Sequence, residues 1–258
     1  MFTTLPYVAV ALAVKLGLTL GAHYGGVVEF TDVSMVLTGG VFLIGFMLAG
    51  TMADFKESEK IPGEVACTLE MIEETFAQAA VGRASFDLGA HRRALLSLAN
   101  ELQDWLHKKR SGADIYAALT QLGQQIQDME KVGAGPHANG ALRELHNLRK
   151  SVTRISVISR TGFLASGYAL LEVLSVAIIG LLLVSRFKNL ITEVTLVSFV
   201  TLIYVYMVRL IRDIDDPFEY SEGGQRGAAE VELFPLDEYV QRLTTRVHVQ
   251  TTGARAAS

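Results

Sequence analysis

The chain has 258 residues, half of which are apolar, and a mean hydropathy of +0.32. This composition is too apolar for an ordinary soluble domain and indicates a membrane protein. The net charge of −4 argues against nucleic acid as the main partner, and the single cysteine, Cys67, excludes a disulfide within the chain.

Four apolar runs have the length needed to span a bilayer, roughly 17–25 residues. They form two pairs on either side of a charged segment, and Lys15 interrupts the first run. The runs are 5–22, 33–52, 162–184 and 190–211. We therefore expect an all-α membrane protein with four transmembrane helices in two pairs, divided into segments 1–52, 53–161, 162–211 and 212–258.

The second apolar run contains a pair of phenylalanines, Phe42 and Phe46, on one face of the expected helix. Thr38 and Ala49 flank the pair on either side. In an assembly, one such helix from each subunit would build a narrow pore with phenylalanine rings at its throat. The alternative is that both rings contact lipid or pack against other helices. Four small residues allow neighbouring helices to approach closely: Gly39, Gly40, Gly45 and Gly50.

Two charged side chains, Lys15 and Glu172, lie within apolar runs. The cost of a charge inside the bilayer favours burial in the bundle or in a water-filled cavity, often with mutual pairing. Three interpretations follow: an ion pair between the first and third runs, a site that lines an ion path, or side chains that reach the membrane surface.

Segment 53–161 holds 14 of the 23 Lys and Arg residues, whereas loop 23–32 has none. The positive-inside rule places this segment and both termini in the cytoplasm of a protein of the inner cell membrane. Arg186 and Lys188 in the loop between the last two runs point the other way, but two charges do not outweigh fourteen.

The cytoplasmic segment has the spacing of packed helices. Ser111 and Asp114 form a variant of the capping box ahead of the expected helix 113–130. Pro62 is expected to kink the continuation of the second apolar run. We expect helices at 54–80, 92–109, 113–130 and 141–158, a turn at 133–140, and disorder over 244–258.

Four carboxylates follow the last apolar run: Asp213, Asp215, Asp216 and Glu219. Calcium prefers several oxygen ligands, but this spacing is not that of an EF-hand loop. We expect these acids to organise the end of the helix, with Arg209 and Arg212 as neutralising partners, and calcium binding is the alternative. No nucleophile motif, phosphate loop or dinucleotide fingerprint is present, so neither an enzyme nor a cofactor is predicted.

Two stretches resemble the bestrophin family of ion channels. The sequence Phe42-Leu-Ile-Gly45-Phe46 is similar to the Phe-x-x-Gly-Phe pattern of the bestrophin pore helix, and residues 211–220 and 233–237 are similar to the acidic-Pro-Phe-Gly and Leu-Pro-Leu-Asp signature after its last helix. The order of elements also agrees, from about residue 5 to 243. Glu219 stands where the family usually has Gly, and residues 54–59 replace an Arg-x-x-x-Trp cluster, which indicates a divergent, bacterial branch.

The resemblance implies a homopentamer that passes small monovalent ions through a pore lined by the second apolar run. It leaves the sign of the ion open, because animal bestrophins conduct anions and some bacterial relatives pass cations. Acids at Glu29 and Asp32 outside, and at Asp54, Glu57 and Glu59 inside, favour cations if they face the path. Helix N-termini that point at the axis would favour anions instead. A transporter and a non-conducting scaffold with a partner-binding cytoplasmic domain remain as alternatives.

Overall fold

The structure is a computed structural model that describes residues 4–22, 26–160, 165–215, 217–218, 220 and 229–256. The described chain is largely helical and divides into two compact units. Unit 1 comprises Met1–Phe55 and Thr161–Asp215, and unit 2 comprises Lys56–Arg160 and Asp216–Ser258. The division into membrane segments 1–52 and 162–211 and cytoplasmic segments 53–161 and 212–258 stays a prediction.

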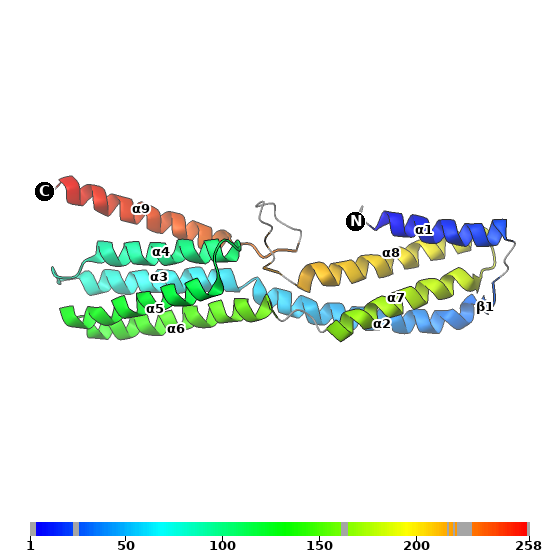
Figure 1. Ribbon diagram of the computed structural model, residues 1–258, viewed down its shortest axis with the longest axis horizontal. Helices are drawn as coiled ribbons and strands as arrows, with labels where there is room; N and C mark the ends of the chain where they lie inside the picture. The colour runs from blue at the N-terminus through cyan, green and yellow to red at the C-terminus, as the bar shows by residue number, and fades with distance from the viewer. Residues whose placement is uncertain are drawn as a thin grey trace. The chain divides into compact units, whose positions relative to one another are not determined.

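Unit 1 contains the apolar helices (Figure 1). They are α1 (Leu5–Leu16), which continues as a π-helical turn (Gly17–Gly21), α2 (Phe30–Ser58, of which the last turn belongs to unit 2), α7 (Ala165–Val184) and α8 (Leu190–Asp215). α2, α7 and α8 are long and apolar enough to cross a membrane, and the helix from Leu5 to Gly21 is apolar but shorter. The predicted run 162–184 begins at residues that lie outside the described part of the chain.

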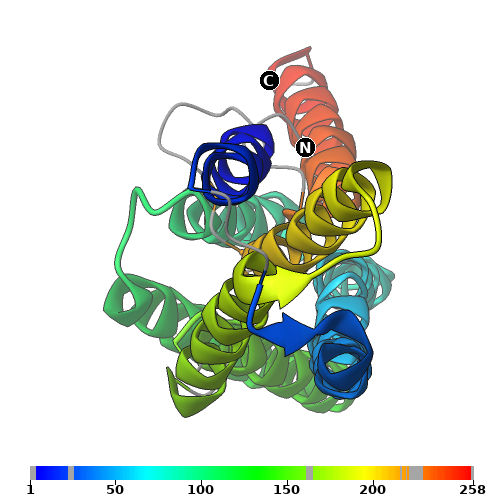
Figure 2. The ribbon, with the colours of Figure 1, turned by 90° about the vertical axis from the view of Figure 1, so that its right-hand side faces the viewer.

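A two-residue parallel strand pair joins the loops at one end of unit 1, as Figure 2 shows. Val28 of β1 (Val28–Glu29) pairs with Ser185 of β2 (Ser185–Arg186). Gly26 precedes β1 with φ +80°, and a Cβ there would lie 2.7 Å from the backbone nitrogen of Arg186. The loop can therefore approach β2 this closely only with glycine at this position.

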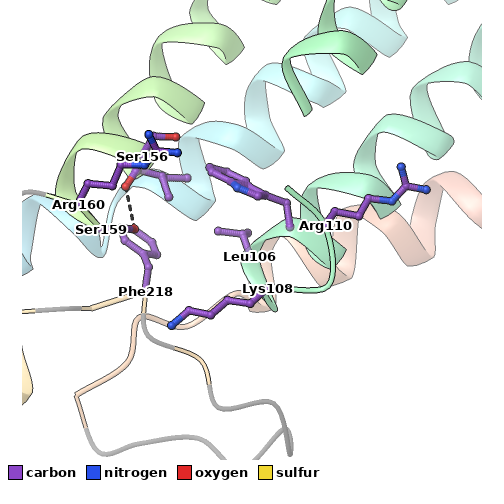
Figure 3. Close-up of a pocket in the computed structure, with 9 residues that line it drawn as sticks. Leu106, Lys108, Arg110, Ser156, Ser159, Arg160 and Phe218 are labelled. Atoms are coloured by element: carbon purple, nitrogen blue, oxygen red, sulfur yellow. Dashed lines mark hydrogen bonds between the residues drawn. The ribbon is translucent and has the colours of Figure 1, made fainter. Parts of the chain in front are cut away.

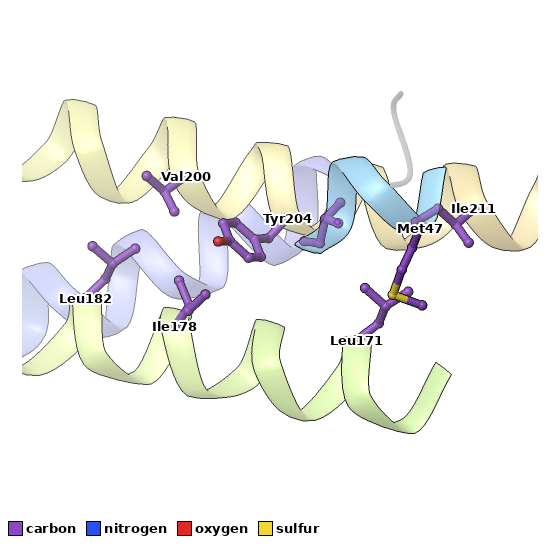
Figure 4. Packing of buried hydrophobic residues seen from close by; sticks show 8 residues of the cluster. Met47, Leu171, Ile178, Leu182, Val200, Tyr204 and Ile211 are labelled. Atoms are coloured by element: carbon purple, nitrogen blue, oxygen red, sulfur yellow. The ribbon is translucent and has the colours of Figure 1, made fainter. Parts of the chain in front are cut away.

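The core of unit 1 lies between α2, α7 and α8 (Figure 4). Tyr204 is fully buried there, and its hydroxyl donates a hydrogen bond to the Leu37 carbonyl oxygen at 3.0 Å. Aliphatic side chains from the three helices surround it: Ile44, Met47, Leu171, Ile178, Leu182, Val200 and Ile211.

Unit 2 is a bundle of five helices in the described chain: α3 (Ile61–Ala80), α4 (Leu88–Leu106), α5 (Gly112–Asp128), α6 (Gly135–Ile158) and α9 (Phe234–Ala256). α3 contacts α4, α6 and α9, and α5 contacts α4 and α6. Ser111 and Asp114 form the predicted capping box at the start of α5. Pro62 lies in the first turn of α3. Backbone N–H groups in the first turn have no acceptor within the helix, so proline costs no helical hydrogen bond there.

Two expectations about this unit are wrong. The predicted turn at 133–140 is largely helical, because α6 begins at Gly135 with Pro136 in its first turn and buries Ala138. The predicted disorder from residue 244 is also wrong over 244–256, since α9 continues through that stretch. Ion pairs from Arg242 to Glu70 at 3.1 Å and from Arg246 to Glu73 at 2.5 Å hold α9 against α3.

The contact between α9 and α3 is also polar at its centre. The Tyr239 hydroxyl is buried and donates a hydrogen bond to the Leu69 carbonyl oxygen at 3.2 Å. Burial, and then the neighbouring Glu73 and Glu70 carboxylates, raise the pKa of Tyr239 above its ordinary value. The phenol is therefore neutral and able to donate this bond at physiological pH.

Candidate functional site

α2 presents one exposed and one packed face. At ~100° per residue, Thr38, Phe42, Phe46 and Ala49 lie within ~40° of the Phe42 direction. All four are exposed in the single chain, and the rings of Phe42 and Phe46 are 76% and 72% exposed. The residues that the sequence analysis selected as a pore face thus share one side of the helix, and their neighbours along that side, Met35 and Ala53, are exposed too.

The opposite face of α2 packs within its own subunit. Ile44 and Met47 are buried against α7 and α8. A Cβ at Gly40 would overlap Ile178 and the Tyr204 hydroxyl, so this glycine permits the close approach of the helices. A Cβ at Gly39, Gly45 or Gly50 would meet nothing within 4 Å. Only Gly40 of the four is therefore a packing glycine within the subunit.

Lys15 is buried in unit 1, with 2% of its side chain exposed. Its ammonium group donates to the carbonyl oxygens of Leu183 at 2.9 Å and Ser185 at 2.7 Å, at the end of α7. Carbonyls in the last turn of a helix have no intrahelical partner, and the helix dipole places negative charge there. Lys15 thus acts as a cap for α7.

Glu193 completes this cluster and was not singled out from the sequence. Its Oε1 lies 3.7 Å from the Lys15 ammonium and accepts a hydrogen bond from the Thr19 hydroxyl at 2.6 Å. The predicted Lys15–Glu172 ion pair is therefore wrong. Glu193 lies in the first turn of α8, inside the fourth apolar run. A charged residue within an apolar run is the sequence feature that could have identified it.

Glu172 pairs with Arg212 instead, near the other end of the same two helices. Each side chain is 53% exposed, and the Arg212 guanidinium lies over the Tyr168 ring at 5.6 Å. α7 and α8 run in opposite directions, which brings the start of one beside the end of the other. Lys15 and Glu172, the two charges within apolar runs, thus belong to separate pairs at opposite ends of α7.

The acidic turn is only partly described, because Asp216 and Glu219 lie outside the described residues. Asp213 is exposed, and Asp215 hydrogen-bonds to Tyr168. Within the described part of the chain, no group of three or more His, Cys, Asp or Glu side chains is placed to hold a metal ion. The proposed roles of the four acids, structural or calcium-binding, stay predictions.

Two of the acids expected at the cytoplasmic end of the path are engaged in ion pairs within unit 2. Glu57 accepts two hydrogen bonds from Arg154, at 2.9 and 2.7 Å, and Glu59 pairs with Lys56 at 2.6 Å. These pairs reduce the negative field that the sequence alone would assign to residues 57 and 59.

Unit 2 also contains a cavity of about 210 Å³ between the ends of α4 and α6 (Figure 3). Three cationic side chains line it, namely Lys108, Arg110 and Arg160, together with Trp105 and Phe218. Arg110 is paired with Glu101 at 3.2 Å. The cavity is small, and its basic side chains are exposed to solvent.

The sequence matches no protein-family profile and no curated protein. The fold does have solved counterparts. A bacterial bestrophin homologue from Klebsiella pneumoniae superposes with a TM-score of 0.77 at 15% identity, over 96% of this chain and 98% of that one. A point variant of that homologue gives a TM-score of 0.76 at 15% identity, over 94% and 98%. A structure described only as a membrane protein gives 0.72 at 16% identity, over 97% of each chain.

Proposed function

From a bestrophin-like fold, we propose that this chain forms an oligomeric ion channel whose pore is lined by α2. The observation that carries the proposal is the division of α2 into two faces. One face is buried against α7 and α8, and the other exposes Phe42 and Phe46 in the isolated subunit. Further copies of the chain would surround an axis toward which this exposed face points.

The proposed throat is a ring of phenylalanine side chains. Such a hydrophobic constriction gates by dewetting, because ions cross only where the passage is wide enough to hold water. Thr38 lies one turn before Phe42, and its hydroxyl makes the passage less apolar on that side of the throat. Ala49 lies about one turn after Phe46, and its small side chain makes the passage wider on that side. Five copies, as the resemblance to bestrophins implies, would form a closed ring with head-to-tail interfaces.

The proposed topology has four membrane-spanning helices with both termini and unit 2 in the cytoplasm. The excess of Lys and Arg in segment 53–161 supports this orientation. Tyr7 and Arg209 also lie together, with the guanidinium 5.0 Å from the ring centroid. Tyrosine and arginine are typical of the membrane surface, where each places a polar end in water.

The experiment combines oligomeric state with ion flux. We expect native mass spectrometry of the detergent-extracted protein to give a pentamer, and reconstituted protein to release ions from liposomes. Replacing Phe42 and Phe46 by Ala should raise the flux, since a dewetting barrier falls as the radius grows. Phe199→Ala is the matched control, because Phe199 is 61% exposed but lies on α8.

Three outcomes would count against the proposal. A monomer at every concentration would remove the pore. A double variant that assembles normally but conducts like the wild type would exclude the phenylalanine throat. A stable oligomer that passes no anions or cations would favour the non-conducting scaffold. Reversal potentials under a salt gradient give the sign of the conducted ion.

A further inference from the structure

An apolar groove of about 550 Å³ runs along the surface of unit 1 between α1, α7 and α8. This volume lies within the ~300–1,000 Å³ typical of small-molecule sites. α1 contributes one wall, and Tyr7, Val10 and Val14 on it are 53%, 63% and 45% exposed. The other wall includes Ile179, Leu183, Thr201 and Val205. The groove is thus lined mainly by apolar side chains and is open at the surface of unit 1.

One residue that lines the groove, Thr201, has a hydroxyl without a hydrogen-bond partner among the described residues. Thr201 is 1% exposed. Threonine in a helix commonly donates to the carbonyl four residues earlier, as Thr51 does to Met47 at 2.9 Å. A buried hydroxyl that forgoes this bond costs about 1–3 kcal/mol. The oxygen is buried beneath the wall of the groove and is closed to a bound molecule, so the groove itself presents an apolar lining.

A cation lies at one end of the groove. Thr201, Val205 and Arg209 follow one another at four-residue spacing, so they share a face of α8 over a rise of ~12 Å. The Arg209 guanidinium lies over Tyr7, which lines the groove, and no carboxylate of the described residues is at ion-pair distance from it. Tyr7 also lies in the first turn of α1, where the helix dipole favours an anion.

These three features match one kind of molecule. We propose that the groove binds an acyl chain of an anionic phospholipid of the cytoplasmic leaflet, whose phosphate pairs with Arg209 at the end of the groove. A leaflet contributes ~15 Å of hydrocarbon, and the lining residues Tyr7 to Val14 of α1 follow the groove over a rise of ~10 Å. The proposal rests on the membrane insertion in the proposed function, but not on conduction.

The test is lipid retention by the intact, detergent-extracted protein, measured by native mass spectrometry with phosphatidylglycerol and phosphatidylethanolamine. We expect the wild type to retain phosphatidylglycerol preferentially. Arg209→Gln should reduce that preference about fivefold, as expected for one arginine facing an anionic headgroup. Arg212→Gln is the matched control, because it removes the same charge from the same helix while its partner is Glu172.

A second variant tests the acyl chain separately from the headgroup. Val10→Trp adds a bulky ring at an exposed position that lines the groove, so it should reduce the retention of both lipids without disturbing the core. Equal retention of the two lipids by the wild type would overturn the proposal. So would a preference that survives Arg209→Gln, or one that Arg212→Gln lowers equally. The lipid-retention experiment does not depend on ion flux. A protein that shows these lipid preferences but conducts no ions in the flux experiment would therefore refute the proposed channel function and leave the lipid site standing.

Discussion

The Lys15 ammonium group lies 3.7 Å from the Glu193 carboxylate, and the two side chains are 2% and 8% exposed. The same ammonium caps the last carbonyls of α7. One buried cation therefore ties together α1, α7 and α8. Its hydrogen bonds end on protein groups, which favours a structural role over a place along an ion path.

Removing the Glu193 carboxylate, the negative partner of Lys15, should destabilise the protein strongly. Glu193→Leu leaves a buried ammonium without its counter-charge, and we expect a loss of about 3–5 kcal/mol in the free energy of unfolding. The double variant Lys15→Met with Glu193→Leu should recover part of this loss. Thermal unfolding in detergent measures both. Glu172→Gln is the control, because an exposed pair is worth about 0–1 kcal/mol. Equal effects at Glu193 and Glu172 would contradict the buried pair.

Adjacent glycines on α2 should respond in opposite ways to alanine. At Gly40 the added methyl group overlaps Ile178 and the hydrogen-bonded Tyr204 hydroxyl, so we expect a loss of about 1–3 kcal/mol from overpacking. At Gly39 nothing lies within 4 Å, and alanine should stabilise the helix by about 0.5–1 kcal/mol. Chemical or thermal unfolding of the two variants checks this, and a stable Gly40→Ala protein would mean that α2 packs differently.

The cap of α5 makes a prediction about pH. Hydrogen bonds from the Ser111 side chain, and then from its backbone, hold the pKa of Asp114 below its ordinary value of 3.8. A carboxyl whose pKa is lowered on folding stabilises the protein fully above its unfolded pKa. That contribution is lost as the pH falls through the lower, folded pKa.

The melting temperature of Asp114→Asn, followed by circular dichroism, should therefore lie below that of the wild type by a constant amount above about pH 5. The difference should shrink as the pH falls toward 3. A gap that is unchanged at acidic pH would show that the charge of Asp114 contributes nothing to the cap.

The acidic turn gives a prediction about calcium. We expect titration of calcium into chelator-treated protein to produce no saturable heat, because the spacing of the four carboxylates is not that of an EF-hand loop and Asp215 already hydrogen-bonds to Tyr168. Saturable binding that disappears in Asp213→Ala would overturn this expectation and make calcium a ligand of the protein. Asp104→Ala, on α4, is the control for a general loss of surface charge.

Local pattern was sufficient to predict several elements. The three strongest apolar runs are helices, and the Ser111–Asp114 box starts α5. These features depend on spacings of three or four residues, which a helix brings together wherever it lies in the fold. Helix ends were harder to place. Gly135 and Pro136 look like a turn in the sequence, yet they begin α6, because the next residues bury Ala138.

The residue pattern was sufficient to predict a helical chain, the positions of its apolar segments, and the helix face that Phe42 and Phe46 share. The packing of the helices was needed to show which side of α2 is buried and which charged side chains form pairs. Lys15 and Glu193 are far apart in sequence, as are Glu172 and Arg212. Such pairs depend on the direction and register of helices packed side by side, and spacing along the chain carries no information about either.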